Sequence, residues 1–298
     1  MRLGIMFDNG KPIDDVISQV QRLRDMGFDA AWSSQIFGPD ALTLLAVVGR
    51  AVPDITLGTA VVPTYPRHPM MLAAQALTVQ AATDGRLVLG IGLSHQPVIE
   101  GMFGYSFEKP ARHMREYLSV LMPLLHDGRV QFKGETLSAM GQLRVAGATP
   151  PPVLVAALAP RMLQLTGEQA EGTITWMTGP KTVGEHIVPS VTKAASNAGR
   201  PAPRVVVGLP VCVDADIAAA RETAGKSFQM YGQLPSYRAM LDREGVEGPA
   251  DVAIVGDEGA VASQVRALLD IGATDFVGAP FGSADQRERT LTLLASLA

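Results

Sequence analysis

The sequence has only one cysteine, Cys212, which excludes an internal disulfide framework and is typical of a protein from a reducing compartment. Cys212 lies in the apolar run Val211–Val213, so we expect a packed core thiol. Long hydrophobic runs are missing as well: Ala41–Val48 and Val153–Ala159 stay under ten residues, whereas a membrane-spanning helix needs about 20. The segment Met1–Asp8 has too short an apolar core for a secretory signal peptide and no cleavage site. The sequence thus predicts a cytoplasmic protein.

Blocks of like charge are also absent. The 298 residues include 25 basic and 29 acidic side chains, for a net charge of −4. Binding to nucleic-acid phosphates needs a basic face, so this balance argues against a nucleic acid as partner. With 47% apolar residues, and with Gly and Pro spread along the chain, the composition excludes a disordered or coiled-coil protein.

Several motifs of metal, hydrolase and nucleotide chemistry are missing. The five histidines show no H-x-H or H-E-x-x-H spacing, and no G-x-S-x-G elbow is present. Gly90-Ile91-Gly92 follows an apolar run and begins like a dinucleotide fingerprint, but the third glycine is missing and no helix opens at once. We interpret Gly90 and Gly92 as thinning a strand so that a planar ligand can approach its backbone. The sequence predicts neither a metal site nor a Rossmann fold.

A regular alternation of short apolar runs with longer amphipathic ones dominates the chain. The short runs are continuously apolar, which is typical of strands buried on both faces of a parallel sheet. The predicted strands are Leu3–Phe7, Ala30–Ser33, Ile55–Val62, Leu87–Leu93, Val153–Ala157, Gly172–Trp176, Arg204–Val213 and Thr274–Gly278. Eight strand–helix units in 298 residues fit a (β/α)8 TIM barrel, an α/β fold that typically needs about 250 residues.

Two segments are longer than a strand–helix connection needs. Ser94–Pro152 holds a helical pattern and a polar, Gly-rich stretch, and Asp214–Ala273 holds an extra helix and the ambiguous run Asp251–Val255. We therefore expect insertions after strands four and seven. No low-complexity linker divides the chain, so residues 1–298 are predicted to form a single domain.

Basic side chains gather in the loops that follow the predicted strands. In barrels of this kind the chemistry lies at the carboxyl ends of the strands. The basic and histidine side chains of these loops are Arg67, His68, His95, Lys109, Arg112, His113, Arg115, Arg161 and Lys181. Loops at the opposite end carry mostly acids. The arrangement predicts a small anionic ligand at one mouth of the barrel.

Five stretches of the chain form a pattern that is more specific than any single motif. They are Met26–Trp32 (G-F-D-x-x-W), Leu57–Pro69 followed by Ala73–Ala76, Asp84–Gly92 (G-R-x-x-L-G-x-G), Ala170–Gly172 and Gly272–Asp275. Together they resemble the luciferase-like monooxygenase superfamily over essentially the whole chain. Within that superfamily the sequence is most similar to the branch that uses coenzyme F420, a deazaflavin, rather than FMN.

This resemblance implies a barrel that holds F420 at its carboxyl-terminal mouth, with the anionic lactyl-glutamyl tail of the cofactor running outward. The implied activity is that of an F420-dependent oxidoreductase, which transfers a hydride between the deazaflavin and a small organic substrate. The resemblance also implies a non-prolyl cis peptide bond in strand three, at a position that matches Ala60–Val61. An FMN-dependent monooxygenase of the same fold and a non-catalytic deazaflavin-binding protein are the alternatives.

The sequence departs from the family at two positions of the expected site. Where some members carry Asp-His at the end of strand two, this chain has Ser34-Gln35, and where some carry Gly-Glu after strand four it has Ser94-His95. The candidate catalytic residues are therefore His95, as a proton donor or acceptor, and Gln35, as a hydrogen-bond donor to a ring edge. Cofactor binding is predicted for Ala60, Val61, Val62, Ser94, His95, Leu158, Ala159, Arg161, Met177, Thr178, Gly179 and Lys181. None of these residues specifies the substrate.

Two predicted helices carry more apolar surface than a single barrel needs. Met70–Leu77 is apolar on more than one helical face. The segment Leu42–Val48 also has more aliphatic residues than a single apolar stripe needs. A helix on a barrel needs only one apolar stripe, so the excess predicts a homodimer. We expect a small-molecule substrate as the other partner, and neither a nucleic acid nor a membrane.

Overall fold

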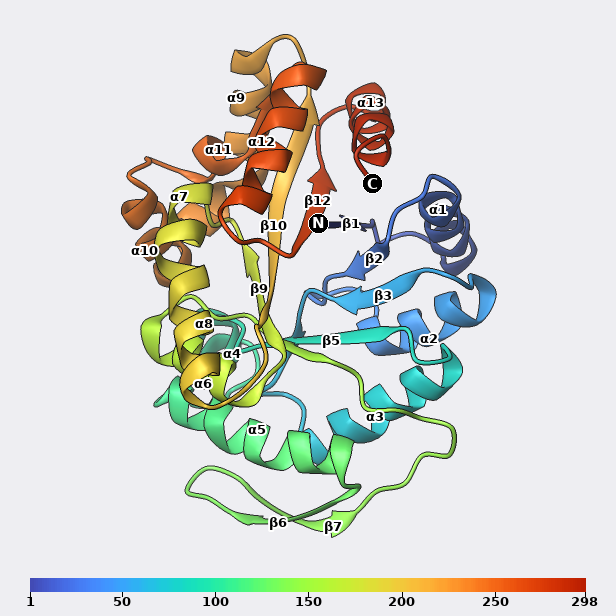
Figure 1. The fold of residues 1–298 in the computed structure, drawn as a ribbon, viewed down its shortest axis with the longest axis vertical. Helices are drawn as coiled ribbons and strands as arrows, with labels where there is room; N and C mark the ends of the chain where they lie inside the picture. The colour runs from blue at the N-terminus through green and yellow to red at the C-terminus, as the bar shows by residue number, and fades with distance from the viewer.

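The computed structural model describes residues 1–298, and its centre is a closed ring of parallel strands (Figure 1). The ring strands are β1 (Arg2–Met6), β2 (Ala30–Ser33), β3 (Thr56–Thr59), β5 (Leu87–Gly92), β8 (Val153–Val155), β9 (Gly172–Trp176), β10 (Arg204–Val213) and β12 (Asp275–Pro280). Each strand pairs in parallel with the next, and β12 closes the ring on β1 with Arg2 opposite Asp275. The predicted (β/α)8 barrel is confirmed.

The strands are buried on both faces, which explains their continuously apolar sequences. Side chains inside the barrel form one cluster, which consists of Ala30, Trp32, Val88, Leu154, Ile174, Val206 and Val277. A larger cluster of 60 buried residues fills the space between the strands and the helices. Glycine makes room for the largest interior side chain, because a Cβ on Gly58 would lie 2.2 Å from Cε3 of Trp32.

Helices cover the outside of the ring. They are α1 (Ile13–Asp25), α2 (Ala41–Ala51), α3 (Pro69–Ala82), α5 (Pro110–His126), α6 (Pro160–Gln169), α8 (Val188–Asn197), α12 (Glu258–Asp270) and α13 (Ala284–Ala295). The short α7 (Pro180–Thr182) and η1 (Val183–Ile187) lead into α8. No helix combines the length and the apolar composition that crossing a bilayer requires. Since each strand leads into the next helix, the helices begin at the carboxyl end of the barrel.

The third strand of the barrel is interrupted. After β3 the Ala60–Val61 peptide bond is cis, as the resemblance implied, and the chain returns to the sheet as β4 (Val62–Pro63), which pairs with β5. Gly90 and Gly92 of β5 lie against this interruption. A Cβ on Gly90 would lie 2.0 Å from the carbonyl oxygen of Thr59, and a Cβ on Gly92 would lie 2.6 Å from Cγ2 of Val61. Our interpretation of the two glycines is therefore wrong, because the adjacent strand fills the space that we assigned to a ligand.

The chain between β5 and β8 contains α4 (Gln96–Gly101), α5 and an antiparallel hairpin of β6 (Arg129–Lys133) and β7 (Ser138–Gln142). The hairpin lies along α5 at the bottom of Figure 1. Buried Glu116 of α5 holds its turn, because the carboxylate accepts hydrogen bonds from the N–H groups of Glu135, Thr136 and Leu137 at 2.8–3.0 Å. The polar, Gly-rich stretch of the sequence gave no sign of this hairpin.

The chain after β10 contains α9 (Ile217–Phe228), η2 (Gln229–Gln233), α10 (Pro235–Glu244), α11 (Pro249–Val252) and β11 (Ile254–Gly256). The ambiguous run Asp251–Val255 is thus the end of α11 and the start of β11. Strand β11 lies outside the ring and pairs with Val211–Val213, the last residues of β10. Cys212 is fully buried in this extension, as predicted.

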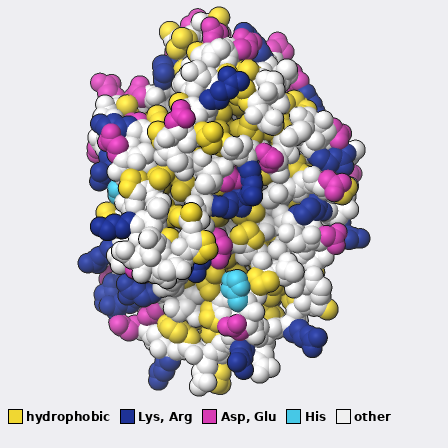
Figure 2. Space-filling model, viewed as in Figure 1, with side chains coloured by type: hydrophobic (Ala, Val, Ile, Leu, Met, Phe, Trp, Pro, Cys, Tyr) yellow, Lys and Arg dark blue, Asp and Glu magenta, His cyan; other side chains and the backbone are white.

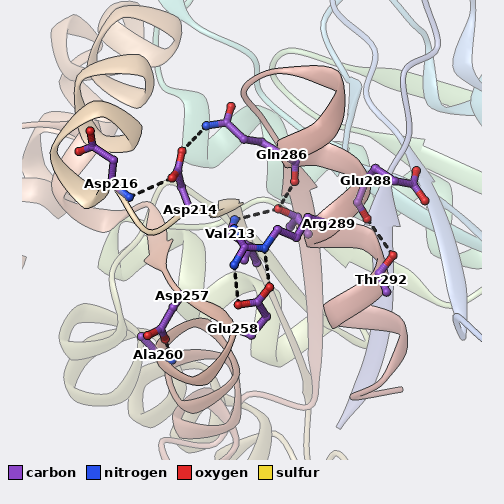
Figure 3. A network of polar contacts seen from close by, with 11 residues as sticks. Val213, Asp214, Asp216, Asp257, Glu258, Ala260, Gln286, Glu288, Arg289 and Thr292 are labelled. Atoms are coloured by element: carbon purple, nitrogen blue, oxygen red, sulfur yellow. Dashed lines mark hydrogen bonds and ion pairs between the residues drawn. The ribbon is translucent and has the colours of Figure 1, made fainter.

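Polar contacts join two elements to α13 (Figure 3). One set comes from the end of β10, and the other comes from the start of α12. The N–H of Val213 donates to Oγ1 of Thr290 at 2.9 Å, and the carboxylate of Asp214 accepts from the side chain of Gln286. Arg289 of α13 pairs with Glu258 at the start of α12, with Nη2 and Oε2 at 2.7 Å. Each of these polar groups has a hydrogen-bond or ion-pair partner within the network, so we assign the network a role in stabilising the fold.

Candidate active site

The carboxyl end of the barrel has an apolar floor. Met6, Ala60, Val61 and Ala156 are half-buried there and pack against the interior cluster. Because these side chains carry no polar group, a flat ring system can lie on them without leaving a buried donor or acceptor unpaired. Ala60 and Val61 thus lie where the sequence predicts a cofactor ring. The side chain of Val62 is fully buried in the outer cluster, so Val62 would contact a cofactor through its backbone, and its predicted contact stays a prediction.

One side of the mouth is an aromatic wall. Trp176, at the end of β9, lies edge-on to Phe228 and Tyr231, with ring centroids 6.2 and 6.0 Å apart. Tyr231 contacts Tyr237 at 5.3 Å, and Tyr237 contacts His95 at 5.4 Å. Sequence reasoning missed the residues of α9, η2 and α10. Three aromatics between positions 228 and 237, in a chain with 5% aromatic residues, were the signal that could have found them.

His95 lies at the start of α4, directly beyond β5, as the sequence predicts. Ser94 before it has a left-handed backbone with φ of 60°, which allows the sharp turn from the strand into the helix. Burial lowers the pKa of His95 below its ordinary value of 6.5. The imidazole is therefore mainly neutral at pH 7, where it can accept a proton, and it becomes a donor as the pH falls.

Gln35 follows β2 and is half-buried at the mouth. Its Oε1 accepts a hydrogen bond from the N–H of Ala41 at 3.0 Å, so the side-chain oxygen caps the start of α2. This bond fixes the amide and leaves its NH2 group to donate. The predicted role of Gln35 as a hydrogen-bond donor is compatible with this arrangement.

A basic groove of about 970 Å³ lies between the amino-terminal part of α5 and the side of α6, along which it extends to Glu168. Its charged lining consists of Lys109, Arg112, Arg115, Arg161 and Glu168. Arg112 pairs with Glu135, whereas Lys109, Arg115 and Arg161 form no ion pair. Figure 2 shows basic side chains gathered at the lower left, where α5 and α6 lie in Figure 1.

The ends of both helices add to the positive potential of the groove. No side chain caps the amino terminus of α5 or of α6. Helix amino termini attract anions through their free N–H groups and the helix dipole. Ala159 starts α6 only three residues beyond Ala156 of the apolar floor. A short stretch of chain therefore connects the floor to the groove, whose lining includes the predicted residues Ala159 and Arg161.

The loop after β9 differs from its predicted role. Glu244, the last residue of α10, accepts hydrogen bonds from the N–H groups of Lys181 at 3.1 Å and Thr182 at 2.7 Å. A Cβ on Gly179 would lie 2.3 Å from the carboxyl carbon of Glu244. A carboxylate of the chain itself thus occupies the amide groups of Lys181 and Thr182, next to the predicted residues Thr178 and Gly179.

The other predicted residues of this region do not line the basic groove. The side chains of Met177 and Thr178 are fully buried. The exposed Lys181 does not line the basic groove. Leu158 is half-buried, and its carbonyl accepts a hydrogen bond from Nε2 of buried His186 at 2.8 Å. Of the predicted tail contacts, the structure therefore brings together those around Ala159 and Arg161.

A second histidine near the mouth, His113 of α5, packs against the loop after β4. The ring of His113 stacks on Tyr65, with centroids 3.9 Å apart, and its Nε2 lies 3.0 Å from Oγ1 of Thr64. Burial lowers the pKa of His113 to about 4, so the ring is neutral at pH 7. Burial also raises the pKa of Tyr65 to about 12. This cluster is a packed wall rather than a source of protons at neutral pH.

Comparison with known proteins agrees with the barrel fold. A model of the luciferase-like monooxygenase family matches residues 1–275. The chain belongs to this family. Luciferase-like proteins are oxidoreductases that use FMN or the deazaflavin F420, so the mouth is the candidate site for a cofactor of that kind.

Similar luciferase-like proteins include users of both cofactors. The 5,10-methylenetetrahydromethanopterin reductase of Methanolobus tindarius is 26% identical over 324 residues, which cover 99% of this chain and 98% of that protein. The coenzyme F420-dependent tetrahydromethanopterin reductase of Methanopyrus kandleri has a TM-score of 0.79 at 22% identity, covering 99% and 97%. The oxygenating constituent of 3,6-diketocamphane monooxygenase from Pseudomonas putida, solved with FMN, has a TM-score of 0.78 at 16% identity, covering 99% and 96%. The two solved structures share the barrel fold of this chain.

Proposed function

We propose that this luciferase-like protein is an F420-dependent oxidoreductase that transfers a hydride between the deazaflavin and a small organic substrate. The observation that carries the proposal is the basic groove between α5 and α6, whose lining residue Ala159 follows Ala156 of the apolar floor by three positions. F420 combines a flat ring with a long tail of phosphate and carboxylates. Its binding therefore needs an apolar surface and a basic surface side by side, as this mouth provides.

The residues of the mouth fit the two parts of the cofactor. Met6, Ala60, Val61 and Ala156 would hold the ring, whose faces are apolar. Lys109, Arg115 and Arg161 would hold the tail, since they lie in one groove and form no ion pairs within the chain. The uncapped starts of α5 and α6 add N–H donors for phosphate or carboxylate oxygens.

When bound, F420 supplies a hydride donor or acceptor at C5 of its ring, and the protein orients the reactants and excludes water. The aromatic wall from Trp176 to Tyr237 shields that side of the mouth from solvent. The proposed role of His95 is to move the proton that accompanies the hydride. Its neutral imidazole takes a proton from a substrate that loses a hydride, and its protonated form gives one to a substrate that gains a hydride.

An FMN-dependent monooxygenase is the second candidate, because an FMN-bound protein shares the fold. FMN carries a single phosphate. A groove of about 970 Å³ with three cations free of ion pairs offers more than one phosphate requires, so the groove favours F420. A non-catalytic deazaflavin-binding protein would use the same groove and differs only in lacking turnover.

Parallel fluorescence titrations of the purified protein with F420 and with FMN test the cofactor. We expect a micromolar Kd for F420 and a much weaker one for FMN, and micromolar FMN binding without F420 binding would overturn the proposal. Turnover of reduced F420 across enones, imines and quinones then tests the activity. Tight F420 binding without turnover of any substrate in the panel would support the carrier instead.

A further inference from the structure

The mouth of the barrel has an apolar part next to its basic groove. The loops after β2 and after α4 expose large apolar side chains to solvent. These side chains and their exposed fractions are Ile36 60%, Phe37 63%, Met102 61%, Phe103 43% and Tyr105 49%. We call this set the apolar rim. Proteins rarely expose a contiguous apolar surface unless it binds something.

Contacts through the loop after β4 link the two halves of the apolar rim. Asp40, just beyond Phe37, pairs with Arg67 of that loop. Tyr65 of the same loop stacks on Phe107 at a centroid distance of 5.3 Å. The loop after β2 is therefore tied through the loop after β4 to the chain that follows α4.

The chain of residues 102–107 is folded back on α4 rather than extended into solvent. The N–H of Phe103 donates to the carbonyl of Val98 at 3.2 Å, and the N–H of Tyr105 donates to the carbonyl of Ile99 at 3.0 Å. The N–H of Phe107 donates to Oε1 of Glu100 at 3.2 Å. These bonds present the apolar side chains on a defined surface at the carboxyl end of β5.

The charge of this surface indicates what it binds. The ion pair of Asp40 and Arg67 links the two loops, and its charges cancel. Three cations that form no ion pair, Lys109, Arg115 and Arg161, lie together in the groove between α5 and α6. An anionic ligand is therefore directed to the groove, and an uncharged apolar one to the rim.

We propose, on the basis of the function proposed above, that the substrate is an elongated, uncharged organic molecule. Its reacting end lies over the apolar floor, and its apolar body lies along the rim that Phe37 and Phe103 form. The rim thus selects substrates by apolar length. Short substrates with the same reacting group leave the rim uncovered and bind weakly.

A series of straight-chain methyl ketones tests this proposal, because its members share one carbonyl group and differ only in methylenes. Isothermal titration calorimetry measures 2-butanone, 2-hexanone, 2-octanone and 2-decanone against the protein, alone and saturated with F420. We expect Kd to fall about threefold to fourfold per added methylene, as burial of each methylene implies. A Kd that is the same across the series would overturn the proposal.

Substitutions on the rim separate specific binding from general hydrophobic adsorption. The double variant Phe37→Ser with Phe103→Ser changes two exposed side chains and is expected to weaken 2-decanone binding about tenfold, with 2-butanone unchanged. The control is Leu269→Ser, which changes a side chain of 50% exposure at the end of α12, at the opposite end of the barrel. Equal losses in the rim variant and the control would overturn the proposal. So would a changed molecular mass of the rim variant in light scattering, because the rim would then bind a second copy of the chain.

The F420 titration of the same proteins distinguishes the two proposals. If F420 does not bind but ketone affinity depends on length and on the rim, the proposed function is wrong and the ligand class of the mouth stands. If F420 binds and ketone length has no effect, only the substrate class is wrong.

Discussion

Two histidines near the barrel mouth illustrate how surroundings decide the role of one residue type. His95 is half-buried beside Tyr237 and has no side-chain hydrogen-bond partner, whereas His113 is stacked on Tyr65 and lies within hydrogen-bond distance of Thr64. Burial lowers both pKa values, and it lowers that of His113 further. His95, whose pKa burial lowers less, is therefore the better candidate of the two for proton transfer.

The first prediction concerns the pH dependence of turnover. Because the pKa of His95 lies below 6.5, its protonated form accumulates only in acid. If it gives the proton, the saturated rate of F420-linked reduction rises as the pH falls through that pKa. Replacing His95→Gln should lower the saturated rate by about 10²–10⁴-fold and remove this rise. A saturated rate within about threefold of the unsubstituted protein, with the same pH profile, would exclude the role.

The second prediction concerns stability and His113. Its pKa is about 4 in the folded protein, and about 6.5 is expected in the unfolded chain. The unfolded chain therefore binds more protons between these values, so the contribution of His113 is present above pH 6.5 and is lost as the pH falls toward 4. After allowance for solvent screening, we expect the loss to be about 1–2 kcal/mol.

Urea unfolding at pH 7 and at pH 4.5 measures this contribution. The variant His113→Phe keeps a ring beside Tyr65 but cannot titrate, so its free energy of unfolding should decrease less on acidification. Loss of the hydrogen bond to buried Thr64 should cost the variant about 1 kcal/mol at pH 7. Exposed His126→Asn is the control and should behave as the unsubstituted protein does. An identical acid sensitivity of all three proteins would contradict the prediction.

At the scale of elements, the ends of helices decide where an anion can bind. α5 and α6 start without side-chain caps and enclose three cations that lack ion pairs, whereas the loop before α7 is closed by the carboxylate of Glu244. The same kind of local sequence, a loop between a strand and a helix, thus gives an open site in one place and a filled one in another. The basic groove is the part of the mouth that an anionic tail can enter.

The third prediction tests the groove. The double variant Arg115→Ala with Arg161→Ala removes two cations without breaking an ion pair. Its Kd for F420 should rise about tenfold at low salt and clearly less at 0.5 M salt, because screening shortens the range of both charges to about 4–5 Å. Arg266→Ala, an exposed arginine of α12, is the matched control. An unchanged Kd at both salt concentrations would refute the placement of the tail.

At the scale of the whole molecule, apolar surface on the outer helices and the hairpin supports the predicted homodimer. Met71 of α3 is 62% exposed, Val47 of α2 is 41% exposed, and Met140 of β7 is 77% exposed. The hairpin and α3 meet, since a Cβ on Gly141 would lie 2.8 Å from Cε of Met70. We propose that a second copy of the chain covers this surface by an isologous contact.

The fourth prediction follows from that contact. Light scattering at micromolar concentration should give twice the chain mass of 31.5 kDa. The variant Met71→Lys should give the monomer mass, because each lysine would face the partner's apolar surface at the symmetric contact. Leu269→Lys, which is 50% exposed at the other end of the barrel, should leave the dimer intact. A monomer mass for the unsubstituted protein would end this proposal.

The sequence by itself determined the barrel, its family and several of the positions around the mouth. Continuous apolar runs such as Leu87–Gly92 and amphipathic runs such as Ile13–Asp25 are local patterns, and their strict alternation leaves few topologies. Because strands in a parallel barrel point the same way, the position of a residue after a strand places it at the mouth. His95, Gln35 and Arg161 could therefore be placed there before the structure was known.

Only the tertiary structure decided which of those positions are open to a ligand. Glu244 reaches the loop before α7 from 62 and 63 positions away in the chain, and Thr59 and Val61 fill the space beside Gly90 and Gly92 across two strands. The aromatic wall joins β9, α9 and α10 in the same way. Such contacts depend on the distances between side chains far apart in sequence, which strand and helix periodicity does not encode. The tertiary structure alone thus separates the open basic groove and the apolar rim from loops that the protein fills itself.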